Sequence, residues 1–181
     1  MKRLGLLRHA KSDWDDIGQR DFDRGLNDRG RKGARLIGEH IAAHGVPFDL
    51  VLASPAERVK ATLVEAMPDE PVRYDPRIYL ADVETLLDVL RSAGDAESVL
   101  LAGHNPGMQD VLFALVPPAR ENDLFDEAAV KFPTAAFAVL LAVGLSVGGT
   151  WFFLSKKDAG ADEAKAEASA EPAVPVKQAA I

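Results

Sequence analysis

The sequence contains no cysteine. This absence excludes disulfide bonds, thiolate metal sites and cysteine nucleophiles. Basic residues are also outnumbered: 21 lysines and arginines stand against 28 acidic residues, which gives a net charge of −7. A protein that binds nucleic acid in general normally presents a basic face, so nucleic acid is not expected as a partner. An anionic ligand would need a local cluster of positive charge.

Long apolar runs are almost missing as well. The apolar run at the N-terminus is too short for a signal peptide and ends at Arg8 and His9. The exception is residues 132–155, which carry no charge and are long enough to span a bilayer. Their central glycines, between two groups of β-forming residues, favour two buried strands joined by a turn over the alternative of a membrane anchor. We therefore expect a cytoplasmic protein without a membrane span.

The composition changes near residue 158. The chain up to residue 157 is long enough for one domain with a substantial core. The whole sequence is 48% hydrophobic and 27% charged, as in ordinary globular proteins. Residues 158–181 consist largely of Ala, Glu, Lys and Pro, and such a segment buries too little apolar surface to fold. We expect one domain over residues 1–157 and a disordered tail over residues 158–181.

Strands and helices are expected to alternate along the domain. Apolar runs predict strands at residues 2–8, 49–53, 72–74 and 98–103. Capping residues predict helices from Asn27 to His44, from Ser54 onward, from Asp82 to Ser92 and from Asn105 to Val116. Ser54 and Asn105 are each followed by proline, which is common at the first helical position. The alternation predicts an α/β fold, a three-layer sandwich with a mostly parallel central sheet and helices on both faces.

Three of the expected strands lead into basic or imidazole side chains. The first strand ends at Arg8 and His9, the helix after the second strand carries Arg58, and the last strand ends at His104. In open α/β sheets ligands bind beyond the carboxyl ends of the strands, so these four residues are expected to meet there. Arginine forks bind phosphate oxygens in pairs, and a neutral histidine beside a phosphate can attack phosphorus as a nucleophile.

The segments at these strand ends resemble motifs of the histidine phosphatase superfamily, and more narrowly of its small bacterial phosphohistidine phosphatase branch (SixA-type). The resemblance lies in three segments, which occur in the expected order: Leu7-Arg8-His9-Ala10-Lys11-Ser12, Ser54-Pro55-x-x-Arg58-x-x-x-Thr62 and Gly103-His104-Asn105-Pro106. The first is similar to the Arg-His-Gly opening of the superfamily. The resemblance covers about residues 1–154 and implies a phosphoglycerate mutase-like fold.

The resemblance also implies a role for each matching residue. His9 would accept the phosphoryl group as the nucleophile, with Arg8 beside it. Arg58 and His104 would complete a phosphate-binding pocket, in which His104 also stabilises charge in the transition state. Arg24 falls where the small branch places a further arginine, and we expect it to bind phosphate as well.

The sequence departs from the family pattern at a few positions. Ala10 replaces the usual glycine, and Gly25 replaces a common proline. No general acid is evident. Glu84 is the candidate, with Asp82 as the alternative, provided that the loop before their helix reaches the pocket.

Together the residues and the resemblance predict a metal-independent phosphatase that needs no cofactor and forms a covalent intermediate on His9. The first expected substrate is phosphohistidine on a protein partner, because imidazole leaves more readily than an alkoxide and no inserted segment is present to enclose a small molecule. A small phosphomonoester is the alternative substrate. A non-catalytic module that binds phosphorylated ligands is the second alternative. Phosphate-like and sulfate-like anions are expected to bind in the pocket.

Overall fold

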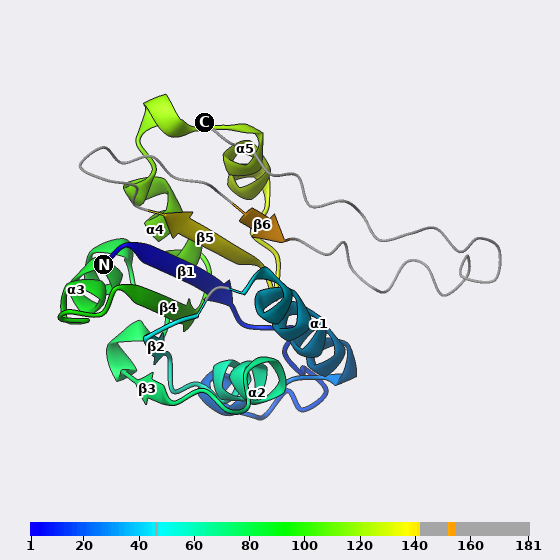
Figure 1. The fold of residues 1–181 in the computed structure, drawn as a ribbon. Helices are drawn as coiled ribbons and strands as arrows, with labels where there is room; N and C mark the ends of the chain where they lie inside the picture. The colour runs from blue at the N-terminus through cyan, green and yellow to red at the C-terminus, as the bar shows by residue number, and fades with distance from the viewer. Residues whose placement is uncertain (46, 142–151, 155–181) are drawn as a thin grey trace.

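A computed structural model describes residues 1–45, 47–141 and the backbone of residues 152–154. Its centre is a six-stranded sheet with the order β3-β2-β4-β1-β5-β6 (Figure 1). The strands are β1 (Arg3–Arg8), β2 (Leu50–Ala53), β3 (Val72–Tyr74), β4 (Ser98–Gly103), β5 (Phe137–Leu141) and β6 (Phe152–Leu154). The first four strands pair in parallel, whereas β5 and β6 are antiparallel. The prediction of a mostly parallel sheet is confirmed.

Helices cover both faces of this sheet, which confirms the three-layer sandwich (Figure 1). They are α1 (Asp28–His44), α2 (Glu57–Ala66), α3 (Val83–Arg91), α4 (Gly107–Leu115) and α5 (Asp123–Val130). Single 3₁₀ turns lie at Asp21–Asp23, Pro76–Ile78 and Pro118–Arg120. Helices α1 and α2 pack on one face and on each other, and α3, α4 and α5 cover the other face.

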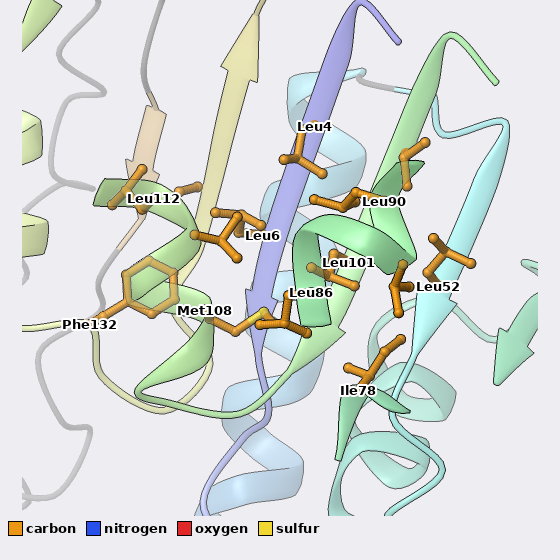
Figure 2. Packing of buried hydrophobic residues seen from close by; sticks show 14 of the residues in the cluster. Leu4, Leu6, Leu52, Ile78, Leu86, Leu90, Leu101, Met108, Leu112 and Phe132 are labelled. Atoms are coloured by element: carbon orange, nitrogen blue, oxygen red, sulfur yellow. The ribbon is translucent and has the colours of Figure 1, made fainter. Parts of the chain in front are cut away.

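The core consists of two main clusters, one on each face of the sheet, because side chains alternate along each strand. On β4, Leu101 belongs to the cluster under α3 and α4, while its neighbour Leu100 belongs to the cluster under α1 and α2. Figure 2 shows the first cluster, in which side chains from the sheet meet those of the two helices above it. Its labelled residues are Leu4, Leu6, Leu52, Ile78, Leu86, Leu90, Leu101, Met108, Leu112 and Phe132. The sheet is thereby fixed from both sides.

Two of the four predicted helix caps are confirmed. The side chain of Asn27 accepts a hydrogen bond from the Gly30 N–H at the start of α1, and that of Asp82 accepts one from the Thr85 N–H at the start of α3. Helix α1 ends at Gly45, whose backbone is left-handed (φ 61°), a conformation that glycine adopts without strain.

The other two predicted helix starts are wrong. Helix α2 begins at Glu57, two residues after the expected first helical position, and α4 begins at Gly107, one residue after it. The hydroxyl group of Ser54 keeps one local bond, since it accepts the Ala56 N–H at 3.3 Å, but both predicted caps also contact distant residues. The hydroxyl group of Ser54 contacts the ring of His104 at 2.9 Å, and the side-chain amide of Asn105 donates to the Phe132 carbonyl at 3.2 Å.

The uncharged segment 132–155 contains strand at both described ends, β5 and β6, as expected. The turn expected between them and the tail expected at 158–181 lie outside the described residues. In the part of the chain that the structure describes, no helix has the length and hydropathy needed to cross a membrane. Helix α5 and the 3₁₀ turn at Asp21–Asp23 were not anticipated, since both are short and weakly patterned.

Candidate active site

The first predicted site residue, His9, is fixed by backbone bonds to two neighbouring strands. It directly follows β1, its N–H donates to the Gly103 carbonyl at the end of β4, and its own carbonyl accepts from the Ala135 N–H just before β5, both at 3.0 Å. Figure 1 shows the arrowheads of β1 and β4 at the same edge of the sheet. The parallel pairing of these strands therefore brings His9 next to His104.

Side-chain contacts tie the segment after His9 to α1 and α2. The Ala10 N–H donates to the Thr62 hydroxyl at 3.0 Å, and that hydroxyl donates to the Arg58 carbonyl at 2.6 Å. Gly30 lies so close that an added Cβ atom would be 2.1 Å from the Lys11 carbonyl oxygen. Only glycine allows α1 to approach this loop so closely. The nucleophile candidate is thus held on a rigid support.

The imidazole of His9 is a neutral ring with a defined tautomer. Its Nδ1 lies 2.7 Å from the Ala10 carbonyl oxygen, and because a carbonyl only accepts, Nδ1 must carry the proton. The other nitrogen, Nε2, then keeps its lone pair. Burial, together with the positive charges of Arg58 and Arg8, lowers the pKa of His9 to about 4. His9 is therefore neutral at pH 7, which a nucleophilic nitrogen requires.

The ring of His104 lies beside that of His9, with 5.2 Å between the ring centroids. It is 3% exposed, and its Nε2 is 2.9 Å from the Ser54 hydroxyl. Burial and the neighbouring His9 and Arg58 lower the pKa of His104 to about 3. Although Nδ1 of His104 is buried, no described residue forms a hydrogen bond with it. This nitrogen can donate to an anion if Ser54 donates its hydroxyl proton to Nε2.

The guanidinium of Arg58 is buried and paired with a carboxylate. One terminal nitrogen donates to the backbone carbonyl of Asp21, and the other donates to Oδ2 of Asp21 at 2.9 Å. The Tyr79 hydroxyl donates to the same Oδ2 atom at 2.7 Å. The Tyr79 ring is also edge-on to the ring of His104, at 5.4 Å between centroids. Arg58, Asp21, Tyr79 and His104 therefore form one connected cluster.

Arg8 completes the positive side of this cluster. Its terminal nitrogen donates to the Phe132 carbonyl, while its buried Nε forms no hydrogen bond with any residue in the described ranges. Burial lowers the pKa of Arg8 below its ordinary value, but a guanidinium keeps its charge at neutral pH. Since this charge lowers the pKa of both His9 and His104, Arg8 acts on both rings.

Two neutral imidazoles and two guanidinium groups thus share one edge of the sheet. Such a set can bind a tetrahedral oxyanion, because arginine donors match phosphate oxygens and a low-dielectric environment strengthens their attraction. Among the described residues no three histidine, aspartate or glutamate side chains gather in a way that could hold a metal ion.

Comparison with known proteins places this arrangement in a family. The model of the histidine phosphatase superfamily (branch 1) matches residues 4–104. An uncharacterized protein of Mycobacterium leprae (strain TN) is 33% identical over 159 residues, which cover 84% of this chain and 94% of that protein. The chain belongs to the histidine phosphatase superfamily.

Solved structures agree with this membership. The Agrobacterium tumefaciens protein assigned as the phosphohistidine phosphatase SixA superposes with a TM-score of 0.69 at 37% identity, covering 77% of this chain and 91% of that one. The protein from Nakamurella multipartitia with the same assignment gives a TM-score of 0.67 at 28% identity, covering 87% and 96%. Within the histidine phosphatase superfamily, the chain is thus similar to its SixA-type branch, as the sequence motifs predict.

The contacts of Arg24 lie apart from the cluster. It is buried, but its terminal nitrogens donate to the backbone carbonyls of Asp16 at 3.0 Å and Gln19 at 2.9 Å. Its guanidinium also stacks over the ring of Trp14, 4.3 Å from the centroid. These contacts support the loop that follows His9. The role of Arg24 in binding phosphate stays a prediction.

Glu84 is an exposed residue in the first turn of α3. The carboxylate of Asp82, the alternative, accepts the N–H of Thr85, and this bond lowers the pKa of Asp82. An ionised cap is a poor proton donor. The structure thus gives Glu84 no contact with the phosphate-site residues, and a general acid role for it stays a prediction.

Sequence reasoning missed three members of the cluster: Ser54 in its role as a partner of His104, and Asp21 and Tyr79 altogether. Tyr79 is one of only two tyrosines in the chain, but nothing in its local pattern marks it. It reaches the cluster because the segment before α3 packs closely on α4, where a Cβ atom added to Gly107 would lie 2.6 Å from the Ala81 carbonyl oxygen. This contact joins segments far apart in the sequence.

Proposed function

We propose that this member of the superfamily hydrolyses phosphohistidine on a partner protein through a covalent intermediate on His9. One observation carries the proposal: His9 is neutral and the lone pair of its Nε2 is available. Its ring centroid lies 5.2 Å from that of the neutral His104, and the charges of Arg8 and Arg58 act on it. A site that only bound phosphate would not need an uncharged imidazole with a defined tautomer among positive charges.

The first step is attack of His9 on phosphorus. Nε2 forms a new N–P bond while the bond from phosphorus to the substrate imidazole breaks, and the electron pair of that bond goes to the departing nitrogen. The proton on Nδ1 of His9 stays in place, held by the Ala10 carbonyl. The ring therefore becomes a phosphorylated cation, which the dianionic phosphoryl group balances.

The second step is hydrolysis of this intermediate. A water oxygen forms a bond to phosphorus as the bond to Nε2 breaks, and the electron pair returns to Nε2. One water proton stays on the new phosphate oxygen, and the other passes to phosphate or solvent. His9 is thereby returned to its neutral form. In both steps Arg8, Arg58 and the Nδ1–H of His104 would stabilise the charge that spreads over the phosphoryl oxygens.

The preference for an N–P bond rests on chemistry and on relatives. A phosphorylated imidazole leaves as a neutral ring once its second nitrogen is protonated, whereas an alkoxide needs a proton from a general acid. The candidate for that acid, Glu84, is exposed and has no described contact with the cluster. In addition, two of the similar structures carry the assignment of phosphohistidine phosphatase. Hydrolysis of a small phosphomonoester by the same steps is the alternative.

A trapping experiment tests the intermediate. The protein is mixed with a partner protein that carries labelled phosphohistidine, quenched in alkali to preserve the acid-labile N–P bond, and mapped by mass spectrometry. The label is expected on His9 in the wild type and in His40→Ala, which alters an exposed histidine of α1. Label on another residue, or no label during rapid turnover, would contradict the mechanism.

A substrate panel tests the bond type. The wild-type protein is assayed on phosphohistidine in a protein, on N-phosphoimidazole and on a series of small phosphomonoesters. We expect kcat/KM to be higher for the two N–P substrates. Turnover of the phosphomonoesters alone would refute the proposed substrate and leave the phosphatase assignment in place.

A further inference from the structure

We propose that Asp21 determines the substrate class: its carboxylate favours a leaving group that departs from a protonated ring and disfavours one that departs as an alkoxide. The inference rests on the proposed function and names a residue that the family motifs described above do not include. Three observations carry it, namely the bonds of the carboxylate, its position relative to solvent and the charge of its loop.

The carboxylate of Asp21 has one oxygen engaged and one available. Oδ2 accepts from Arg58 at 2.9 Å and from Tyr79 at 2.7 Å, while Oδ1 accepts no hydrogen bond from any residue in the described part of the chain. Two donors fix the plane of the carboxylate. Its second oxygen is therefore held in a set orientation and can accept an N–H from a ligand.

Exposure places Asp21 on the solvent side of the cluster. The side chain of Arg58 is 5% exposed and that of Asp21 is 46% exposed. A phosphoryl group bound by the buried arginine must carry its leaving group toward solvent, because that group belongs to a protein surface. The leaving group then lies on the side where Asp21 offers Oδ1.

Asp21 is a base and not an acid at neutral pH. Burial by itself would raise its pKa, but the hydrogen bonds from Tyr79 and Arg58 outweigh this effect, and the pKa of Asp21 is lowered. Burial and the bond to Asp21 raise the pKa of Tyr79, so the phenol keeps its proton. An ionised carboxylate cannot protonate an alkoxide, and it repels the negative charge that grows on such a group.

The surrounding loop has the same sign of charge. Residues 13–23, which we call the aspartate loop, begin shortly after His9 and contain five aspartates against the single basic residue Arg20. Within this loop Arg20 is already paired with Asp23. A negative loop at the solvent side of the cluster attracts a substrate ring that is cationic before its bond to phosphorus breaks, and it repels the negative charge that grows on an alkoxide.

The negative charge of Asp21 and of the aspartate loop acts differently on the two classes of substrate. A phosphorylated imidazole whose second nitrogen carries a proton is a cationic ring, and that N–H can donate to Oδ1 of Asp21. When the N–P bond breaks, its electron pair neutralises the ring, and the proton stays on the second nitrogen. An oxygen ester offers no such cation. Its leaving oxygen gains negative charge as the O–P bond breaks, so the same carboxylate opposes the reaction.

The test compares two substrates in one variant. Asp21→Asn keeps the shape and an oxygen acceptor for Tyr79 but removes the charge. We expect kcat/KM for N-phosphoimidazole to fall by roughly tenfold to a hundredfold, as for loss of a hydrogen bond to a charged group, while kcat/KM for a phosphomonoester stays the same or rises. Asp88→Asn, at an exposed aspartate of α3 outside the aspartate loop, is the matched control and should leave the ratio of the two values unchanged.

Three other outcomes would count against the inference or against the proposed function. An equal fall for both substrates would overturn the inference, because it would show that Asp21 only positions Arg58. An unchanged ratio with unchanged activity would overturn it too. If the wild type shows no activity on any N–P substrate, the proposed function itself fails, and this result is visible before any variant is made. Thermal melting of Asp21→Asn confirms that the variant is folded.

Discussion

The two halves of the site are built in different ways. His9, Arg58 and His104, the strand-end trio, lie at the ends of β1 and β4 and in the first turn of α2, where the paired strands and packed helices leave them little freedom. The aspartate loop has a backbone bond from Asp13 to Gly25 at one end, and is otherwise held chiefly by Arg24 on its backbone carbonyls and by Asp21 on Arg58. Under the proposed function, we expect the trio to set the phosphoryl chemistry and the loop to set the choice of substrate. Changes in the two halves should then affect different measurements.

The largest effect is expected from the trio. His9→Ala removes the attacking nitrogen and leaves both arginines in place, so turnover should fall by at least about 10⁴-fold, as for other lost nucleophiles. Binding of inorganic phosphate, measured by calorimetry, should change by less than about tenfold, because the charged donors that bind it remain. His40→Ala is the control. Undiminished turnover in His9→Ala would remove His9 from the mechanism.

The second-largest loss of activity is expected when the shape of a hydrogen-bond donor in the trio is changed. Arg58→Lys keeps the positive charge but replaces a planar fork with a point charge. We expect kcat/KM to fall by roughly 10²-fold to 10³-fold, the range seen when one transition-state donor is removed. Arg91→Lys, at an exposed arginine of α3 paired with Asp88, provides the control. Wild-type kcat/KM in Arg58→Lys would show that Arg58 serves only to hold Asp21.

The two histidines of the trio should also give stability a pH dependence in the range between pH 6.5 and about 4. The pKa values of His9 and His104 are lowered to about 4 and about 3 in the folded protein, against about 6.5 in an unfolded chain. The unfolded state therefore binds more protons between pH 6.5 and about 4. The free energy of unfolding should fall through this window as pH falls, by up to about 1.4 kcal/mol per pH unit for each histidine.

Urea denaturation in phosphate-free buffer measures this slope. His104→Gln removes one of the two titrations, so its free energy of unfolding should fall less steeply below pH 6.5 than that of the wild type. His40→Gln, at an exposed position of α1, is the control for replacing a histidine. Equal slopes in the wild type and His104→Gln would show that His104 is not held neutral by burial.

The contrast between the halves also explains what could be predicted from the sequence. Buried strands produce apolar runs, so β4 was predicted with its true bounds, and the convergence of His9 and His104 followed from the rule that parallel strands end at one edge. Such a rule needs only local patterns. It therefore works for the trio.

The loop offers no such pattern. Asp21 is one of five aspartates in residues 13–23, and only its packing on Arg58, 37 residues away in the sequence, distinguishes it from the others. The predicted helix start at Ser54 was wrong for a related reason. Its sequence context matches a helix cap, but its hydroxyl group pairs with His104, which is 50 residues away. Long-range partners of polar side chains are not visible in a local pattern.

The smallest effect is expected at Arg24, where the resemblance and the observed contacts differ. The family pattern predicts that Arg24 binds phosphate, whereas its terminal nitrogens donate to the carbonyls of Asp16 and Gln19. If its contribution is support of the aspartate loop, Arg24→Ala should change inhibition by inorganic phosphate by less than about threefold while lowering kcat/KM for a phosphohistidine protein by about tenfold, the cost of about one lost hydrogen bond. Arg91→Ala, at an exposed arginine of α3 outside the aspartate loop, is the control. A loss of tenfold or more in phosphate affinity would show that Arg24 binds phosphate together with the trio and does not act only as a support of the aspartate loop.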